Sequence, residues 1–492
     1  MGAVEDRISE LPEPLIHHIL TFLPIKSVVS TTLLSKKWNN LWLSLRVLDF
    51  TQWRSSTYKN HIEEDSDSYT GSDTDTEQDE YRVIKDSPPV DLSETNRFID
   101  FLDKVLFVDD KLAHIKIFFL QTDSMYFDQD RVKEWIKAIV MRSVEELILS
   151  IKCSGPRVIP LELFYCESLT VLHLWFDNKQ VIDQSPLSTL SFKRLKILRL
   201  SFIHFKDKTF AMQIFSNCPV LEDLHMSTVS WKGLDVICFA LPQLKFFDIC
   251  GFGRERIEDV KVKFDTPNLV SLTWFDHLPE EFIVDSFPCL VEAGIRYSLA
   301  EGHTKNRYDS LNKFIEKVSH VKHLMVSHTY FRPKILEDSS VLPISYHTFR
   351  NLVSFEVDVI YYGQIGLLFD TILEFSPNLT SLIFNQLLTY HNVGEDLLPL
   401  NIVPRCLSLS LKSIEFRRFY GCPKEMEVVK LFLKNARVLQ TVTLGSLSHH
   451  LEYLNKKKPT AKEIEDANNK ILEQLRAFSW ASSDCVVKFL NL

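Results

Sequence analysis

One pattern of apolar residues recurs along this chain and constrains its fold more than any other feature. Each copy has an apolar residue, two further residues, a second apolar residue, one further residue and a third apolar residue. Twelve copies begin 21 to 32 residues apart. They are Val144-Leu147-Leu149, Leu169-Leu172-Leu174, Leu195-Leu198-Leu200, Leu221-Leu224-Met226, Leu244-Phe247-Ile249, Leu269-Leu272-Trp274, Leu290-Ala293-Ile295, Val321-Leu324-Val326, Leu352-Phe355-Val357, Leu379-Leu382-Phe384, Leu411-Ile414-Phe416 and Leu439-Val442-Leu444. A sustained repeat of this length predicts a stack of similar units.

The spacing within each copy predicts a short strand. The last two apolar residues alternate toward the core, and the first anchors the turn before the strand. Prolines two residues before the first apolar position favour an extended entry to the strand. They are Pro219, Pro242, Pro267, Pro288 and Pro377. No unit can bury its own apolar face, so neighbours are expected to stack into a curved solenoid with a parallel sheet inside.

The repeat length is close to the 20–29 residues typical of leucine-rich repeats. Two further triplets, Leu112-Ile115-Ile117 and Leu45-Leu48-Phe50, are candidate earlier copies. Segments between strands, such as residues 210 to 218, are expected to be short helices on the outer side. A regular repeat also has Asn or Cys three residues after the last apolar position, where it bonds turn backbone. Those places hold Lys152, Asp177, Ile203, Val229, Phe252 and His277. We therefore expect an irregular solenoid with some variable backbone pairing.

The first fifty residues carry a different pattern, that of short helices. Leu15, Ile16, Ile19, Leu20 and Leu23 follow helical spacing. Pro24 ends that helix and suits the first turn of the next one. Ser35 is a suitable N-cap for a third helix that carries Trp38, Leu41 and Trp42. Three short helices cannot bury so many large apolar side chains alone, so this segment predicts a partner protein.

Residues 6 to 50 resemble an F-box, and most closely the F-box that plant proteins join to leucine-rich repeats. The matching stretches are Leu11-Pro12-Glu13-Pro14-Leu15, Ile19 to Pro24, and Leu34 to Trp42. The resemblance implies docking on a Skp-family adaptor, which connects to a cullin and a RING protein. The adaptor-binding positions that it implies are Leu11, Pro12, Leu15, Ile19, Leu20, Leu23, Pro24, Leu34 and Trp38.

An acidic tract follows the F-box-like segment. Residues 61 to 80 hold nine acids and no Lys or Arg; without them the chain has 56 acids and 56 bases. The tract predicts a disordered tether. Phosphorylation control is the alternative, because Thr70, Ser72, Thr74 and Thr76 each precede an acid by three positions. The charge balance elsewhere does not favour nucleic-acid binding.

The C-terminal part resembles the FBD motif that ends many plant F-box/repeat proteins. The resemblance rests on Pro404, Cys406, Leu407, Leu411, Lys412, Ile414, Phe416, Gly421, Glu425, Glu427, Leu431, Leu433, Asn435, Ala436 and Leu439, and on Ser482, Ser483, Cys485, Val487 and Phe489. Strand, helix (residues 427 to 436) and strand would cap the open end of a solenoid, which a repeat array requires.

Catalytic and metal-site patterns are weak. Gly251-Phe252-Gly253 lacks the third glycine of a nucleotide loop. His320, His323 and His328 have no Cys or carboxylate at metal spacing. The nine cysteines contain no C-x-x-C pair and predict buried thiols in a reducing compartment. No run approaches the roughly 18 apolar residues of a membrane helix. We expect an intracellular protein, in the nucleus or cytoplasm, with no catalytic residues, no metal, no cofactor and no nucleic-acid or membrane partner.

The expected fold is α/β, a three-helix F-box followed by an irregular leucine-rich-repeat solenoid shaped as a horseshoe. The expected regions are 6–50, F-box; 51–90, linker with the acidic insertion 61–80; 91–400, solenoid; and 401–492, FBD-like cap.

The F-box resemblance implies the substrate-recognition subunit of an SCF-type ubiquitin ligase. The repeats would hold an unidentified target protein near the charged enzyme, so the rate gain would come from proximity. Seven residues at outward-facing strand positions are the candidates for target binding. They are His173, Trp175, Arg199, His225, Phe275, Arg296 and Glu356. For Trp175 and Phe275, packing under loops is an equal alternative.

Two other functions stay open. The first is an adaptor-bound scaffold outside degradation. The second is a small-molecule receptor, since some plant relatives sense hormones with an inositol-phosphate cofactor in the repeats. A polyphosphate site needs several converging cations. The residues midway between the two inward positions of each strand include one Arg and three acids. They are Ile148, His173, Arg199, His225, Asp248, Thr273, Gly294, Met325, Glu356, Ile383, Glu415 and Thr443. This composition argues against such a site.

Overall fold

The computed structural model divides the chain into two compact units, Met1–Gly233 (unit 1) and Leu234–Leu492 (unit 2). It describes residues 11–20, 22–23, 25–31, 38, 45–51, 92–108, 114–182, 192–205, 208–230, 235–251, 260–297, 305–331, 347–388, 403–445 and 459–490. The acidic tract at 61–80, the candidate nucleotide turn at 252 and 253, and most of the expected third F-box helix lie outside the described residues.

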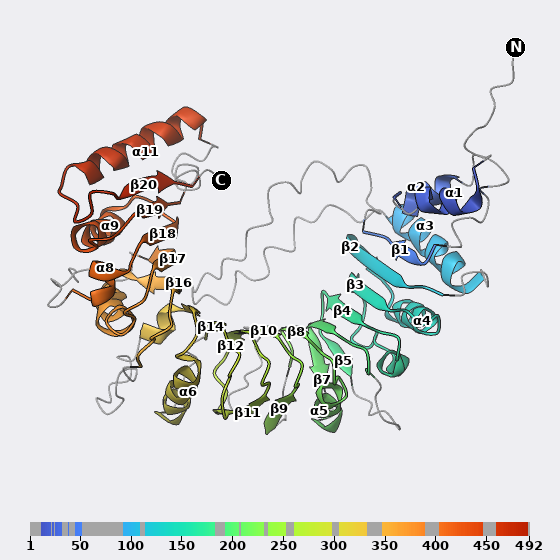
Figure 1. Cartoon of the computed structure of the whole chain (residues 1–492). Coiled ribbons are helices and arrows are strands. Elements are labelled where there is room, and N and C mark those ends of the chain that lie inside the picture. Colours follow the sequence, from blue (N-terminus) through green and yellow to red (C-terminus); the bar gives the residue numbers. More distant parts are fainter. Residues whose placement is uncertain are drawn as a thin grey trace, which may run out of the picture. The chain divides into compact units, whose positions relative to one another are not determined.

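Unit 1 is built on a parallel sheet in the order β1-β2-β3-β4-β6-β8 (Figure 1). A two-stranded sheet, β5-β7, accompanies it. The elements are α1 (Glu13–Leu20), α2 (Ile25–Ser30), β1 (Val47–Asp49), α3 (Leu92–Asp103), the π-helix η4 (Lys104–Val108), β2 (Ile117–Phe127), α4 (Gln129–Val140), β3 (Glu146–Cys153), the 3-10 helix η5 (Leu161–Tyr165), β4 (Val171–Phe176), β5 (Gln180–Ile182), β6 (Ile197–Ser201), β7 (Ile203–Phe205), α5 (Lys208–Ser216) and β8 (Asp223–Ser227).

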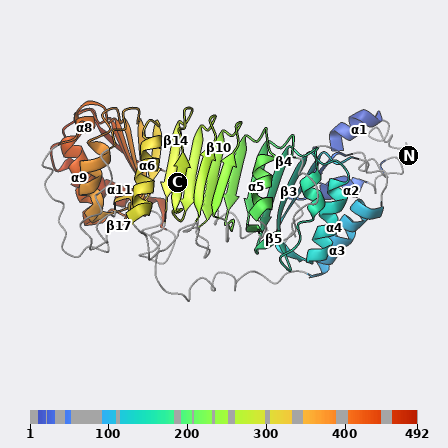
Figure 2. The same cartoon turned by 90° about the horizontal axis from the view of Figure 1, so that it is seen from below.

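Unit 2 is built on a parallel sheet in the order β10-β12-β14-β15-β16-β17-β18-β19-β20, with a three-stranded parallel sheet, β13-β11-β9. The elements are β9 (Val236–Ala240), β10 (Phe246–Gly251), β11 (Lys261–Asp265), β12 (Ser271–Asp276), β13 (Glu281–Val284), β14 (Glu292–Arg296), α6 (Lys305–Val318), β15 (His323–Val326), η6 (His328–Phe331), β16 (Ser354–Tyr361), η8 (Tyr362–Gln364), α7 (Ile365–Leu368), η9 (Phe369–Leu373), β17 (Ser381–Leu388), α8 (Arg405–Leu409), β18 (Ser413–Arg418), α9 (Pro423–Asn435), β19 (Thr441–Leu444), α11 (Ala461–Arg476) and β20 (Val486–Phe489). Figure 2 shows the strands of each unit side by side and in one direction.

The apolar triplets determine the register of both sheets. Leu147, Leu172, Leu198 and Leu224 are partners across neighbouring strands of unit 1, and each is at most 1% exposed. In unit 2 the same position aligns from β10 to β20. The residues between them face away from the core, which defines the outward face of each sheet. The earlier triplet at Leu45-Leu48-Phe50 is also buried, and β1 pairs with β2.

Hydrogen bonds between turns involve a position that the repeat pattern did not indicate. Asn268, Asn351 and Asn378 stand immediately before the first apolar residue of their repeats. Their Nδ2 groups donate to a carbonyl of the preceding turn, at 2.8, 3.2 and 2.8 Å. At the position where Asn or Cys is usual, Asp177 accepts the Cys153 N–H at 3.1 Å. Side chains therefore do bond the turn backbone, but these asparagines stand nine residues before the position that is usual in a regular repeat.

The outer side of the repeats agrees only partly with the sequence prediction. The expected helix at 210–218 is present as α5. Between Leu221 and Leu290, however, β9, β11 and β13 replace helices. Successive triplets there begin only 21 to 25 residues apart. A strand advances about 3.3 Å per residue and a helix 1.5 Å, so a strand crosses the outer side with fewer residues.

Aromatic side chains fill the space between the two sheets of unit 2. Phe264 on β11 lies 5.3 Å from Phe247 and 5.6 Å from Phe239, between ring centroids. Phe282 on β13 stacks on Phe314 of α6 at 4.1 Å. Helices α6, α8 and α9 lie along one face of the unit 2 strands (Figure 1).

The FBD-like region continues the sheet. The strand expected around residues 482–489 is β20, which pairs in parallel with β19. The helix expected over 427–436 begins earlier, as α9, because Pro423 occupies its first turn and Glu425 completes a capping box with Cys422.

The cysteines differ in exposure. Cys153, Cys166, Cys218, Cys406 and Cys485 are buried, whereas Cys289 is exposed, so the prediction that all the thiols are buried is wrong. No helix in the described ranges combines the length and apolarity needed to cross a bilayer.

Candidate functional site

The apolar residues of helix α1 lie on two faces of the helix, one buried and one exposed. Ile16 and Leu20 are fully buried. Leu15 and Ile19, four residues apart and therefore on one side of the helix, are 51% and 39% exposed. Leu23 is 39% exposed, and Phe22, which the sequence analysis did not select, is 74% exposed. The outer face of α1 and the turn after it thus form an apolar surface, here called the α1 surface and made of Leu15, Ile19, Phe22 and Leu23.

The other predicted adaptor-binding residues lie in different settings. Pro12 is exposed and Leu11 half-buried. Leu20 and Trp38 are buried, so neither presents its side chain at the surface of this structure. Pro24 and Leu34 lie outside the described residues.

The outward face of unit 1 carries a row of three predicted residues. His173, Arg199 and His225 are register partners on β4, β6 and β8. Arg199 forms an ion pair with Asp223 at 3.0 Å, between Nη2 and Oδ2. Burial, then the nearby Arg199 and His225, lower the pKa of His173. The structure therefore brings these three side chains together, with one acid beside them.

Trp175 lies two residues beyond His173 on the same face. Its ring meets Phe202 edge to face, with centroids 6.2 Å apart. Phe202 stands in the bend between β6 and β7 and has φ +61°, an uncommon left-handed value for a non-glycine residue. Trp175 remains half-buried, so it packs against a bend and still presents part of its ring to solvent.

The outward face of unit 2 carries the other predicted residues. Phe275 and Arg296 are register partners on β12 and β14. The ring of Phe275 covers Gly294: a Cβ added to Gly294 would lie 3.4 Å from Phe275 Cε1. The ring of Phe275 therefore lies over the neighbouring strand β14 at Gly294.

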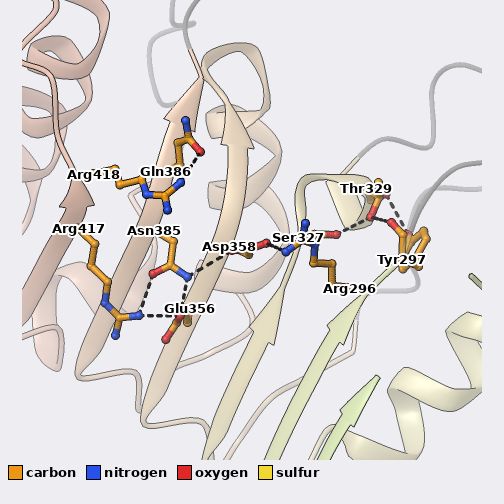
Figure 3. A network of polar contacts seen from close by, with 10 residues as sticks. All are labelled: Arg296, Tyr297, Ser327, Thr329, Glu356, Asp358, Asn385, Gln386, Arg417 and Arg418. Atoms are coloured by element: carbon orange, nitrogen blue, oxygen red, sulfur yellow. Dashed lines mark hydrogen bonds and ion pairs between the residues drawn. The ribbon is translucent and has the colours of Figure 1, made fainter. Parts of the chain in front are cut away.

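Arg417 on β18 is the centre of a polar network on this face (Figure 3). Its Nε donates to Glu415 Oε1 at 3.0 Å, and its Nη1 donates to Glu356 Oε1 at 2.9 Å and to Asn385 Oδ1 at 2.8 Å. Asn385 Nδ2 in turn donates to Glu356 Oε1 at 2.8 Å. Contacts thus run from β18 across β17 to β16.

Arg296 enters the same network from the other side. Its Nη1 lies 3.0 Å from Asp358 Oδ2, two strands away on β16. Asn385 Nδ2 also approaches Asp358 Oδ1, at 3.4 Å. Arg296 and Glu356, both predicted from sequence, are therefore linked through Asp358 and Asn385 (Figure 3).

The sequence analysis missed Asp358, Asn385 and Arg417, although a signal for them existed. Each stands two residues after a residue of the middle outward row, and alternation along a strand places both on the same face. The sequence prediction covered residues of the middle row but, of the residues two positions further along each strand, only Trp175, Phe275 and Arg296.

The arginines of this network are already neutralised. Glu356, Asp358 and Glu415 surround Arg296 and Arg417, so three acids face two cations. The acids are less exposed (16%, 19% and 32%) than Arg417 (44%) and Arg296 (33%). The guanidinium groups are therefore the more solvent-exposed part of this network.

Glu425, at the start of α9, is the buried acid of the FBD-like region. It is 1% exposed, and its Oε2 accepts the N–H groups of Tyr420 and Cys422 at 2.9 and 3.1 Å. Its Oε1 is buried and has no hydrogen-bond partner among the described residues. Burial raises the pKa of Glu425 to about 7, although the two N–H groups oppose this shift.

Replacing Glu425 by glutamine is expected to remove a pH dependence of stability. The folded-state pKa, about 7, exceeds the unfolded value of about 4.3, so Glu425 contributes most stability below about pH 4 and loses that contribution as pH rises through about 7. From about pH 5 to pH 8, the free energy of unfolding of the wild type should fall by up to about 3 kcal/mol more than that of Glu425→Gln. Chemical denaturation across this pH range would measure it, with Glu473→Gln on the exposed side of α11 as control. Parallel pH curves for wild type and Glu425→Gln would contradict the role of Glu425.

The side chains considered for metal or nucleophilic chemistry lie in other settings. In the described part of the chain no three His, Cys, Asp or Glu side chains gather as metal ligands would. His320 Nε2 lies 2.9 Å from the Phe287 carbonyl oxygen. Burial raises the pKa of the Cys153 and Cys218 thiols to about 12, the opposite of what activates a nucleophile.

Three family models match separate parts of the chain. The F-box domain model matches residues 8–50. A model of the repeats of "FBD-associated F-box protein At5g56370, LRR repeats" matches residues 132–294, and the FBD model matches residues 399–444.

Similar proteins come from Arabidopsis thaliana. The putative F-box/FBD/LRR-repeat protein At2g05300 is 27% identical, over 90% of this chain and 92% of that protein. The FBD-associated F-box protein At5g22730 is 29% identical, over 90% and 88%. The putative F-box/FBD/LRR-repeat protein At3g59240 is 32% identical, over 59% and 51%.

Proposed function

Because the chain has the F-box, leucine-rich-repeat and FBD regions of the plant F-box/FBD/LRR-repeat proteins, we propose that it is the substrate-recognition subunit of an SCF-type ubiquitin ligase. The F-box would bind a Skp-family adaptor, and through it a cullin and a RING protein. The repeats would hold the target. This chain would be a non-catalytic receptor that acts by proximity, in the nucleus or cytoplasm.

The α1 surface is the observation that carries this proposal. A short helix with Leu15 and Ile19 on its outer side, followed by Phe22 and Leu23, exposes large apolar side chains next to one another. Contiguous exposed apolar surface marks a site of protein association. The F-box match at residues 8–50 supports a Skp-family adaptor as the partner class.

Several finer features belong to the same proposal. The F-box would have three helices, and the parallel strands would line the inner side of a curved horseshoe. We keep the regions 6–50, 51–90, 91–400 and 401–492 as proposed domains, with the last one capping the solenoid. The in-line register of the strands and the position of β20 at the end of the sheet order are consistent with this arrangement.

The outward strand faces are the proposed target-binding surfaces. They carry His173, Trp175, Arg199 and His225 in unit 1, and Phe275, Arg296 and Glu356 in unit 2. Half-buried aromatic rings and ordered arginines are the side chains that most often anchor interfaces.

The small-molecule alternative has less support from the same faces. A bound polyphosphate needs cations that are not already paired. Arg199 pairs with Asp223, Arg296 with Asp358, and Arg417 with Glu356. The scaffold alternative predicts the same adaptor and target contacts, and differs from the proposal only in the fate of the bound target.

Affinity purification of the full chain with the proteasome inhibited would test the proposal. We expect the adaptor, a cullin and ubiquitinated target proteins to co-purify. Adaptor without cullin or ubiquitinated proteins would favour the scaffold alternative.

The double variant Trp175→Ala and Arg296→Ala is expected to lose target proteins and keep the adaptor, because truncating an interface anchor typically costs about 2 kcal/mol or more. The change would be measured by comparing the proteins that co-purify with each form. Arg437→Ala, an exposed arginine in the turn before β19, is the matched control. An unchanged set of targets from a folded double variant would place target binding elsewhere.

A further inference from the structure

The guanidinium group of Arg417 is fixed along its edge. Guanidinium N–H groups lie in the plane of the group, so acceptors bind at its rim. Glu415, Glu356 and Asn385 supply three acceptors at 2.8 to 3.0 Å from Nε and Nη1. These bonds determine the orientation of the plane before any partner arrives, which lowers the entropy cost of binding.

The flat faces of this group are not used by those contacts. Arg417 is 44% exposed, whereas Glu356 beneath it is 16% exposed. Because Arg417 reaches from β18 over β17 to β16, its side chain lies across the sheet. A ligand that approaches the outward face therefore meets a planar, partly exposed cation.

The local charge argues against an acidic ligand. Glu356, Asp358 and Glu415 balance the charges of Arg296, Arg417 and the neighbouring Arg418, which among the described residues bonds only to Gln386, so the group has no net positive charge to attract a carboxylate. An aromatic ring can bind without an excess of positive charge. It stacks on the face of a guanidinium whose edge is already hydrogen-bonded, and Arg is weakly hydrated enough to permit this.

The rest of the face suits the same kind of ligand. The ring of Phe275 lies over Gly294, and its register partner Arg296 is held by Asp358. An aromatic ring and two ordered arginines thus occur on one face of one sheet. Such side chains are the common anchors of protein interfaces.

We propose that the outward face of unit 2 binds a target protein through an aromatic side chain that stacks on the guanidinium of Arg417. The inference rests on the proposed receptor function and specifies the chemistry of the target. Glu356, Glu415 and Asn385 are positioning residues, because they orient the arginine and do not contact the ring.

A conservative variant distinguishes stacking from simple charge attraction. Arg417→Lys keeps the positive charge and removes the plane. The full chain, co-purified with its adaptor, would be panned against a phage-displayed random peptide library. Enriched peptides would then be synthesised and their affinities measured for the wild type, for Arg417→Lys and for Arg437→Lys as control.

We expect enriched peptides to contain Trp, Tyr or Phe, and Arg417→Lys to bind them about ten-fold more weakly, because lysine keeps the charge but loses the planar stacking and the fixed orientation of the guanidinium group. Replacing the aromatic residue of the peptide by leucine should cause a similar loss. Affinity should change less than about three-fold between low and high salt, because the network is neutralised. The control should match the wild type.

Several results would overturn the inference. These are peptides rich in Asp or Glu that bind Arg417→Lys as well as wild type, affinity that falls steeply with salt, or enrichment that does not depend on residue 417. A melting temperature for Arg417→Lys within about 2 °C of the wild type would show that lost binding is not unfolding. Adaptor binding and target capture, measured on the same samples, report separately on the proposed receptor function.

Discussion

The double substitution Leu15→Ala and Ile19→Ala is expected to reduce the affinity for a Skp-family adaptor by a factor on the order of 10³. Both side chains are exposed on the outer side of α1, and truncating an apolar anchor typically costs about 2 kcal/mol. Two such losses at 25 °C correspond to that factor. Titration calorimetry with a purified adaptor would measure it.

Leu409→Ala is the matched control for this experiment. Leu409 is also an exposed helical leucine, 65% exposed on α8, and lies outside the F-box. It should leave adaptor affinity unchanged. The double variant should also melt at the wild-type temperature, because neither side chain is part of the core. Full adaptor affinity in the double variant would refute the assignment of the α1 surface.

Phe264→Ala is expected to destabilise unit 2 by about 3–5 kcal/mol, the usual cost of removing a buried phenyl ring. Phe264 is 4% exposed on β11, and its ring centroid lies within 5.7 Å of those of Phe239, Phe247 and Phe287. The cavity left behind would weaken the packing between the two sheets of unit 2. Urea denaturation followed by tryptophan fluorescence would report the change.

Phe246→Ala supplies the comparison on β10, a strand of the other sheet of unit 2. Phe246 is 50% exposed on β10. Its removal should cost less than about 1 kcal/mol, since exposed substitutions are usually close to neutral. Equal losses from the two variants would mean that the aromatic cluster between the sheets does not stabilise unit 2.

The repeat architecture could be predicted because its physical cause is local. An apolar triplet such as Leu172 with Leu174 requires one strand face to be buried, and the same requirement in the next unit brings Leu198 beside Leu172. The same pattern extends through the FBD-like region, so β18, β19 and β20 could also be predicted. The F-box and FBD matches rest on residue identity, which the sequence contains in full.

Other features depend on distances that local patterns do not contain. Whether an outer segment becomes a helix or a strand depends on how many residues remain after the inner strand and its turns are built, as at β9, β11 and β13. The division of the α1 stripe into exposed Leu15 and buried Leu20 depends on what packs beneath the helix.

The apolar pattern and the motifs alone predict which residues face the core, the order of the strands and the resemblance of the three regions to F-box, leucine-rich-repeat and FBD proteins. The folded chain was needed to show that Arg417 reaches Glu356, 61 residues away, and that Arg296 reaches Asp358. The reason is physical: burial follows from a period of two along each strand, whereas polar pairing across strands depends on side-chain length and on the small residues between partners. Ser327, a small residue directly after β15, the strand between those of Arg296 and Asp358, is 2% exposed and bonds to Thr329.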